Sequence, residues 1–212
     1  MAEFVDGIEA MQNVYPAVSV FGSARLKPTH KYYQMAYEVG KELALANFTT
    51  ITGGGPGLME AVNKGAKEHG GHSVGLNIIL PCEQSSNPYL DIGVNFQHFF
   101  VRKVMFVKYA IAFIILPGGF GTMDELFEAL TLIQTDKIYE FPVIIMDTEY
   151  WHDLIAWMKN SMGKTGTVSE DNLGSFYLTD DPKEAVYLVK EFWNEVLSPQ
   201  AKSSKSNFTP KD

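Results

Sequence analysis

The chain has 212 residues, 46% of them hydrophobic, which is enough to fill one sizeable core in a single domain. Its formal net charge of −8 disfavours polymeric nucleic acids and anionic membranes as partners, because neutralising phosphates needs clustered Lys and Arg. A local basic site could still bind one small anion. Cys82 is the only cysteine, so no intramolecular disulfide can form, and a reducing compartment is indicated.

The N-terminal residues carry acids where a signal peptide would carry Lys or Arg, and they lack a long apolar core. No apolar run approaches the roughly 18 residues that span a bilayer. We therefore expect a cytoplasmic protein with no membrane partner.

Short apolar runs alternate with helical periodicities along the whole chain. Strands are expected at 17–21, 48–52, 72–80, 94–99, 111–116, 141–147 and 175–180. Helices are expected at 32–46, 58–70, 101–109, 122–135 and 150–162, and a last helix begins at Asp181-Pro182. Parallel strands need a crossover connection, so this alternation predicts an α/β fold. We expect a doubly wound, mostly parallel, Rossmann-like sheet of about seven strands flanked by helices.

Glycines cluster directly after three of the expected strands, which end near residues 21, 52 and 116. Ligands of doubly wound folds bind beyond the carboxyl ends of the strands. The glycine clusters are therefore the first place to search for a site.

The segment "PGGFGT" (117–122) places three glycines between an apolar strand and a helix. Gly118, Gly119 and Gly121 would let the backbone approach a phosphate beside the positive end of the helix dipole, and the Thr122 hydroxyl would add a donor. The alternative is a tight turn that needs glycine for positive φ, but three glycines in four positions exceed that need. The pattern favours an anion site.

Two other glycine turns are more ambiguous. "TGGGPGLMEA" lacks the Lys-Ser/Thr ending of a P-loop and the spacing of a dinucleotide fingerprint, which disfavours ATP hydrolysis and NAD binding. Gly54 and Gly55 in this segment either contact a ligand or serve packing. "FGSAR" offers Gly22 and Ser23 at a strand end, with the same two interpretations.

Three charged residues are candidates for chemistry near the anion site. Glu125 follows the glycines closely enough to reach a sugar attached to the phosphate, although the helix dipole alone favours an acid in a first turn. Asp124 fits that dipole explanation better. Arg102 lies in an apolar helix and is expected to reach into the cleft, where its fork could clamp a phosphate or a polar ring edge. Lys103 beside it either joins the site or extends to solvent.

The histidines show no metal-ligand spacing, and Cys82 has no evident His or Asp partner. We therefore expect neither a metal nor a thiol nucleophile, and no cofactor.

The chain resembles the Lonely Guy (LOG) family. "PGGFGTMDE" (117–125) matches the family signature PGGxGTxxE, "RK" at 102–103 matches its second motif, and "GGGPGLMEAVNKGA" (53–66) matches its earlier glycine segment. The likeness runs from about Val18 to Trp157. Members of this family cleave the N-glycosidic bond of nucleoside 5′-monophosphates, including AMP and cytokinin ribotides. They were often labelled lysine decarboxylases, but no cofactor-binding lysine motif is recognisable here.

The resemblance implies that Arg102 and Glu125 are the catalytic pair. It also implies that Lys103, Thr131 and the residues from Gly119 to Glu125 surround the nucleotide, and that Glu83 contacts the substrate. With the glycine turns added, the expected substrate-binding residues are Gly22, Ser23, Gly54, Gly55, Glu83, Lys103, Gly118, Gly119, Phe120, Gly121, Thr122, Met123, Asp124 and Thr131. The plant-like family motif is MHxRK, whereas this chain has Phe99-Phe100-Val101 before Arg102. The family histidine is thus absent, and the preferred base stays open.

We accordingly predict a hydrolase that releases free base and ribose 5-phosphate from a nucleoside 5′-monophosphate. One rival is a carrier of a nucleotide or phosphorylated cofactor without turnover, and another is a regulatory or assembly protein. Residues 1–15 are interpreted as an N-terminal extension, 16–197 as one nucleotide-binding domain, and 198–212 as a disordered tail. The apolar surface of the helices at 101–109 and 122–134 predicts a homodimer.

Overall fold

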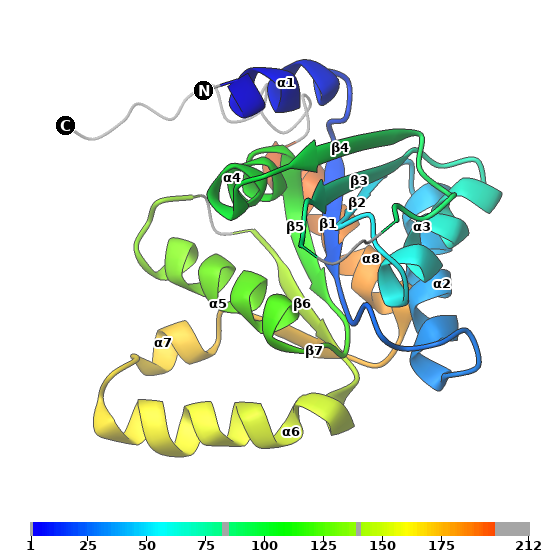
Figure 1. Ribbon diagram of the computed structural model, residues 1–212. Coiled ribbons are helices and arrows are strands. Elements are labelled where there is room, and N and C mark those ends of the chain that lie inside the picture. Colours follow the sequence, from blue (N-terminus) through cyan, green and yellow to red (C-terminus); the bar gives the residue numbers. More distant parts are fainter. Residues whose placement is uncertain (1, 82–84, 139–140, 198–212) are drawn as a thin grey trace.

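The computed structural model describes residues 2–81, 85–138 and 141–197. Its centre is a seven-stranded sheet in the order β4-β3-β2-β1-β5-β6-β7, and every neighbouring pair is parallel (Figure 1). The strands are β1 (Ala17–Phe21), β2 (Thr49–Thr52), β3 (Ser73–Ile78), β4 (Ile92–Phe96), β5 (Ala110–Ile115), β6 (Val143–Met146) and β7 (Tyr177–Thr179). The predicted Rossmann-like fold is confirmed. The predicted tail at 198–212 lies outside the described residues.

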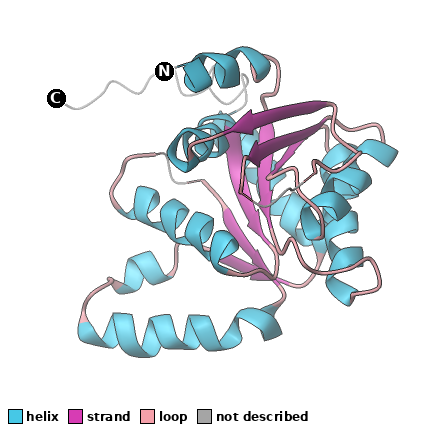
Figure 2. Ribbon diagram, in the orientation of Figure 1, coloured by secondary structure: helices cyan, strands magenta, loops and turns pink. Residues whose placement is uncertain are grey.

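Helices cover both faces of the sheet (Figure 2). One face carries α1 (Ala2–Ala10), α4 (Phe99–Tyr109), α5 (Phe120–Gln134) and α6 (Thr148–Trp157). The other carries α2 (Lys31–Leu45), α3 (Leu58–Glu68) and α8 (Pro182–Phe192). The remaining helical pieces are the π-helical turn after α6 (Met158–Gly163), α7 (Glu170–Leu173) and a π-helical turn after α8 (Trp193–Leu197).

Strand β5 shows why a continuous apolar run was needed. Phe113 and Ile115 point into the core under α4 and α5, whereas Ala112 and Ile114 point into the core under α2 and α8. All four are fully buried, because successive side chains of a strand alternate between faces and both faces are covered. This strand delivers Pro117 and the following glycines to the carboxyl edge of the sheet.

The boundary between β4 and α4 differs from the prediction. The expected strand at 94–99 ends at Phe96, and the expected helix at 101–109 begins at Phe99. The carboxylate of Glu3, in α1, accepts hydrogen bonds from the backbone N–H groups of Gln97 (3.2 Å) and His98 (3.3 Å). These bonds hold the two residues that lead from β4 into α4. Because they come from a distant helix, local periodicity gave no sign of them.

The order of strands reverses at β1, with β2 to β4 on one side and β5 to β7 on the other. The loops after β1, β2 and β5 meet at this switch point. Ser23 N–H donates to Pro117 O at 3.1 Å, and Leu58 N–H donates to Ser23 O at 2.8 Å. Two backbone hydrogen bonds therefore hold the three glycine clusters together at the edge where doubly wound folds bind ligands.

Apolar surface remains exposed on α4, where Phe99, Phe100 and Val104 are each about half exposed. Such surface is compatible with the expected homodimer, which stays a prediction. Within the described residues, no helix has both the length and the apolar composition to cross a membrane.

Candidate active site

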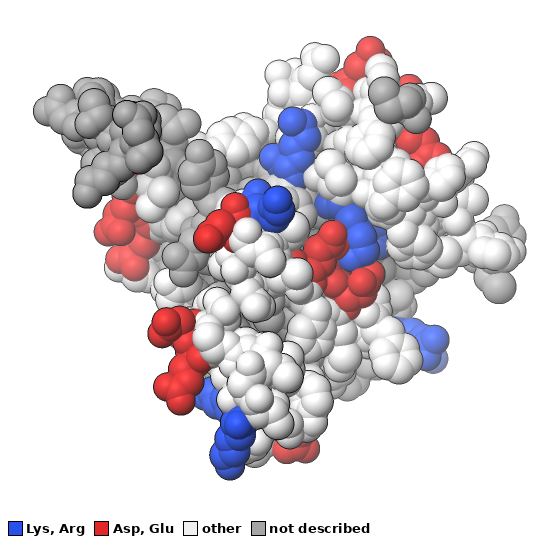
Figure 3. All heavy atoms as spheres, turned by 90° about the vertical axis from the view of Figure 1, so that its left-hand side faces the viewer, with Lys and Arg blue, Asp and Glu red and all other residues white. Residues whose placement is uncertain are grey.

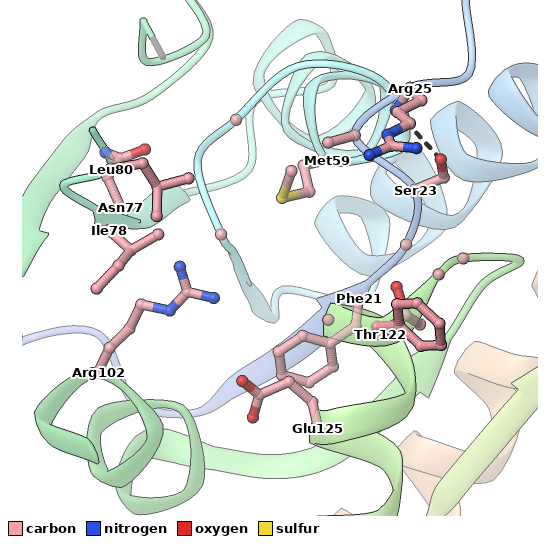
Figure 4. Close-up of a pocket in the computed structure, with 18 of the residues that line it drawn as sticks. Phe21, Ser23, Arg25, Met59, Asn77, Ile78, Leu80, Arg102, Thr122 and Glu125 are labelled. Atoms are coloured by element: carbon pink, nitrogen blue, oxygen red, sulfur yellow. Dashed lines mark hydrogen bonds between the residues drawn. The ribbon is translucent and has the colours of Figure 1, made fainter. Parts of the chain in front are cut away.

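A cavity of about 910 Å³ lies at the carboxyl ends of β1, β2, β3 and β5 (Figure 4). It is lined by residues of the three glycine loops, of the ends of β1, β3 and β4, of the segment after β3, and of α3, α4, α5 and α6. The lining residues are Phe21, Gly22, Ser23, Ala24, Arg25, Gly53, Gly55, Met59, Asn77, Ile78, Ile79, Leu80, Ser85, Asn95, Arg102, Gly118, Gly119, Phe120, Gly121, Thr122, Met123, Glu125 and Tyr150. The volume is near the upper end of the range for small-molecule sites.

The N-terminus of α5 opens into this cavity. Gly119 is the N-cap residue, the last one before the helix, and within the described residues no side-chain hydrogen bond caps the helix there. The first backbone hydrogen bond of the turn is donated by Thr122 to Gly119 O at 3.0 Å, so the N–H groups of Phe120 and Gly121 come before it. Unpaired amides at the positive end of a helix dipole form an anion site.

The glycines of this turn are not there for positive φ, so the tight-turn alternative is wrong. None of Gly118, Gly119 and Gly121 is among the residues with positive φ. A Cβ atom at Gly118 would meet Thr122 Oγ1 at 2.1 Å, which requires glycine for packing. A Cβ atom at Gly119 or Gly121 would meet nothing within 4 Å. These two glycines leave open space in front of the amides, as a bound anion requires.

Tyr150, in α6, holds the glycine turn between β5 and α5 by a hydrogen bond. Its hydroxyl donates to Gly118 O at 2.8 Å, and its own backbone N–H donates to Asp147 Oδ1 at 2.8 Å. The same Asp147 oxygen accepts from the Tyr32 hydroxyl at 3.1 Å. The start of α6 is thus anchored to α2, and from there it holds the glycine turn.

Glu125 occupies the second turn of α5, because the helix begins at Phe120 and not at residue 122 as expected. The explanation of an acid attracted to the first turn by the helix dipole therefore does not apply. The side chain is only 2% exposed, yet it lines the cavity. Its Oε2 atom makes no hydrogen bond within the described residues, and Lys103 Nζ lies 3.4 Å away as a charge contact. A buried carboxylate oxygen without a hydrogen bond is unusual and needs a functional reason.

Burial raises the pKa of Glu125 to about 7, although the nearby Lys103 and Arg102 act in the opposite direction. Near neutral pH the group therefore exists in both protonation states. A carboxyl group with this pKa can accept a proton from water and return it within one reaction cycle.

Arg102 extends from α4 toward the same space, opposite Glu125 (Figure 4). Its guanidinium lies over the rings of Phe106 (5.2 Å) and Phe99 (5.6 Å). Its Nε atom is buried and has no hydrogen-bond partner within the described residues. Burial lowers the pKa of Arg102, whereas Glu125 and Asp124 raise it. Arg102 and Glu125 thus lie on facing walls of the cavity, and within the described residues each has one buried polar atom, Nε and Oε2, that makes no hydrogen bond.

Lys103, Asp124 and Thr131 lie outside the cavity, in a shallower groove between α4 and α5. Lys103 Nζ contacts Glu128 at 2.5 Å and Asp124 at 2.9 Å, and its side chain is 16% exposed. Burial lowers the pKa of Lys103, but these two hydrogen bonds raise it above its ordinary value. The Thr131 hydroxyl donates to Phe127 O at 2.6 Å, within its own helix. The structure therefore does not bring these three residues to the cavity, and their predicted substrate contacts stay predictions.

The loop after β2 contributes Gly53 and Gly55 to the lining, but not Gly54. Gly54 is buried with a φ of +70°, and a Cβ atom there would meet Asn77 Oδ1 at 2.3 Å. Its glycine is explained by conformation and packing, which was the second interpretation of this segment. Glu83 lies outside the described residues, as does Cys82.

Five polar residues of the lining were missed by sequence reasoning: Arg25, Asn77, Ser85, Asn95 and Tyr150. Arg25 stands in the quoted turn "FGSAR", so its position beside a glycine turn could have indicated it. Asn77 follows the apolar part of β3, and with its amide nitrogen toward the β2 loop it donates to the carbonyl oxygens of Gly53 and Gly54, both at 3.2 Å. Asn95 and Tyr150 carry no local signal, because tertiary packing alone places them at the cavity.

Basic and acidic side chains lie beside one another on the face seen in Figure 3, without a broad basic patch. Across the described part of the chain, no three or more His, Cys, Asp or Glu side chains are grouped so that they could hold a metal ion.

Two solved structures resemble this one in fold. The molybdenum cofactor binding protein of the phototrophic bacterium Rippkaea orientalis aligns with a TM-score of 0.61 at 24% identity, over 83% of this chain and 96% of that protein. The molybdenum cofactor carrier protein of Chlamydomonas reinhardtii aligns with a TM-score of 0.63 at 23% identity, over 84% of this chain and 98% of that protein.

Sequence comparison gives a more specific relationship. The family model described as "Possible lysine decarboxylase" matches residues 59–189. The cytokinin riboside 5′-monophosphate phosphoribohydrolase of Mycobacterium tuberculosis is 33% identical over 176 residues, covering 80% of this chain and 90% of that protein. The cytokinin riboside 5′-monophosphate phosphoribohydrolase LOG of Oryza sativa subsp. japonica is 30% identical over 175 residues, covering 81% of this chain and 71% of that protein. With motifs and comparisons in agreement, this chain belongs to the LOG family.

Proposed function

We propose that the protein hydrolyses the N-glycosidic bond of purine nucleoside 5′-monophosphates, AMP or cytokinin ribotides, to free base and ribose 5-phosphate. The observation that carries the proposal is the environment of Glu125. Within the described residues, one oxygen of this buried carboxylate makes no hydrogen bond, and the side chain lies on the cavity wall one turn beyond a helix N-terminus that has no side-chain cap. The names of the curated relatives support the same activity.

In the proposed complex, the 5′-phosphate accepts hydrogen bonds from the amides of Phe120 and Gly121 and from the Thr122 hydroxyl. Anchoring the phosphate fixes the ribose, and positioning of this kind can supply several kcal/mol of the barrier. The anomeric carbon then lies beside Glu125, which is one helical turn further along α5. The base lies toward Arg102 and the apolar side chains at and after the end of β3, of which Ile78 and Leu80 line the cavity.

The reaction breaks the C1′–N9 bond, and its electron pair leaves with the base. Positive charge grows on the sugar as the bond stretches, as in other glycoside cleavages, and the Glu125 carboxylate stabilises it. A water molecule attacks C1′ and gives a proton to Glu125, which the pKa of about 7 allows near neutral pH. Arg102 donates hydrogen bonds to the departing base, which takes its proton from solvent.

The test is incubation of the protein with AMP and detection of adenine by chromatography. Glu125→Gln keeps the size of the side chain but removes the carboxylate that accepts the proton. We expect release of the nucleobase to fall about 100- to 10,000-fold. Glu128→Gln is the matched control, because Glu128 lies one turn further along α5 and pairs with Lys103 outside the cavity. It should retain base release. Equal rates for the two variants would remove the role given to Glu125.

The rival function is a carrier that binds a phosphorylated ligand without turnover. Both functions require phosphate affinity, so binding alone does not separate them. Recovery of intact AMP from a wild-type protein that demonstrably binds it would favour the carrier. A panel of nucleoside 5′-monophosphates would then identify the preferred base for either function.

A further inference from the structure

The chain contains 17 basic residues, of which only Arg25 and Arg102 are arginines. Both line the same cavity, whereas Lys does not occur in the lining at all within the described residues. Arg differs from Lys in presenting a planar fork of N–H donors that matches phosphate and carboxylate oxygens in pairs. The position of both arginines therefore indicates that the ligand offers an acceptor group at two separate places.

The two arginines lie on opposite sides of the cavity (Figure 4). Arg102 faces Glu125 from α4. Arg25 lies in the loop after β1, on the side of Ser23 and Thr122, where the N-terminus of α5 opens. Ser23 N–H donates to Pro117 O at 3.1 Å, so the loop that carries Arg25 is bonded to the loop that begins the glycine turn.

The loop fixes the backbone of Arg25 and leaves its side chain available. Its N–H donates to Ser23 Oγ at 3.1 Å, which holds the turn (Figure 4). Within the described residues, its guanidinium has neither an ion pair nor a hydrogen bond. Lys31, in contrast, lies 3.5 Å from Glu149, and Lys103 has three carboxylates around it. The one acidic residue in the described lining is Glu125, across the cavity.

We propose that Arg25 binds the phosphate of the ligand together with the amides at the start of α5, and thereby determines specificity for phosphorylated over unphosphorylated ribosides. The inference rests on the proposed function in taking the ligand as a phosphate ester of ribose. It assigns the phosphate to Arg25 and leaves Arg102 for the base. Arg25 is a binding residue in this scheme and takes no part in proton transfer.

The experiment measures binding of ribose 5-phosphate by isothermal titration calorimetry, since this compound carries the phosphate and has no glycosidic base to release. Arg25→Gln should weaken its binding about 10- to 100-fold, the effect of losing a charge-assisted pair of hydrogen bonds. Arg25→Lys should recover part of the affinity, because it restores the charge without the fork. Lys27→Gln is the matched control: it removes the same charge two residues away, at an exposed side chain outside the cavity lining.

Kinetics with AMP and adenosine give the second measurement. Arg25→Gln should raise KM for AMP by a similar factor while kcat changes little, and KM for adenosine should not change. The preference for AMP over adenosine would then fall by the factor measured with ribose 5-phosphate. A merely structural effect would raise KM for AMP and for adenosine by the same factor.

Three results would overturn the inference. They are an equal loss of ribose 5-phosphate affinity in Arg25→Gln and Lys27→Gln, an equal rise of KM for AMP and adenosine in Arg25→Gln, or no binding of ribose 5-phosphate by the wild type. Failure of the proposed function has a different signature. In that case the wild type binds ribose 5-phosphate through Arg25 but releases no base from AMP.

Discussion

The segment after β2 (53–57, the β2 loop) contains four glycines, and the segment from the end of β5 into the first turn of α5 (117–121, the β5 loop) contains three, yet the two use them in opposite ways. In the β2 loop, Gly54 has a φ of +70°, and a side chain there would collide with Asn77. In the β5 loop, Gly119 and Gly121 have open space where a side chain would be. One loop needs glycine for its own conformation, and the other needs it to leave room.

The surroundings extend this difference. The β2 loop is satisfied by its neighbours: Gly54 N–H donates to Thr52 Oγ1 at 2.9 Å, and Asn87 Nδ2 donates to Gly55 O at 3.1 Å. The β5 loop, in the part of the chain that the structure describes, opens onto amides without a side-chain cap and onto Glu125, whose Oε2 atom makes no hydrogen bond. Stability and ligand binding are thus assigned to different glycine loops, and substitutions in the two should have opposite consequences.

The largest expected effect is on the pH dependence of stability at Glu125. Its pKa is about 7 in the folded chain against a reference of 4.5, so the folded state holds a proton that the unfolded state has lost between these values. The free energy of unfolding therefore falls as pH rises from about 4.5 through about 7, by up to roughly 3 kcal/mol. Glu125→Gln removes this dependence, and its stability relative to wild type should increase from pH 4.5 to 8. Denaturant unfolding across this range measures it, and parallel curves for the two proteins would contradict it.

Gly54→Ala should destabilise the fold by about 2 kcal/mol, because alanine is strained at positive φ and its Cβ would displace Asn77. The control is Gly70→Ala, which has a similar φ of +75° but nothing within 4 Å of the added Cβ. The control variant should lose less free energy of unfolding, since it reports the backbone strain alone. Chemical denaturation of both variants gives the comparison, and equal losses would show that Asn77 adds nothing.

Gly121→Ala should act on binding and spare stability. The residue is in the first turn of α5 without positive φ, where alanine is a better helix former than glycine. The added methyl group projects into the space assigned to the phosphate, and we expect KM for AMP to rise about tenfold. The melting temperature should stay the same or increase. A clear loss of melting temperature would mean that this glycine, too, serves conformation.

The smallest expected effect is at Tyr150. Tyr150→Phe removes the hydrogen bond to Gly118 O and loosens the turn, so KM for AMP should rise about threefold. Tyr187→Phe is the control, because Tyr187 is an exposed residue of α8 whose hydroxyl contacts only Glu191 in the described structure. The two variants should melt alike and differ in KM.

The sequence predicted those features that follow from local patterns. Apolar runs gave the strands and their parallel pairing, and the glycines after them indicated which edge of the sheet carries the cavity. Glu125 and Arg102 were both expected in the cleft, and both line it. Boundaries set by distant contacts were beyond reach: the residues just before α4 are bonded to Glu3, which is more than 90 residues away. The same holds for Lys103, which pairs with Asp124 and Glu128 in the groove outside the cavity.

The contact between Glu3 and the start of α4 has a practical consequence. The two residues that lead into the helix carrying Arg102 are bonded to the Glu3 side chain of α1. Loss of that carboxylate, by substitution or by removal of α1, would disturb a wall of the cavity without touching any residue that lines it. Recombinant protein for the assays above therefore has to retain α1.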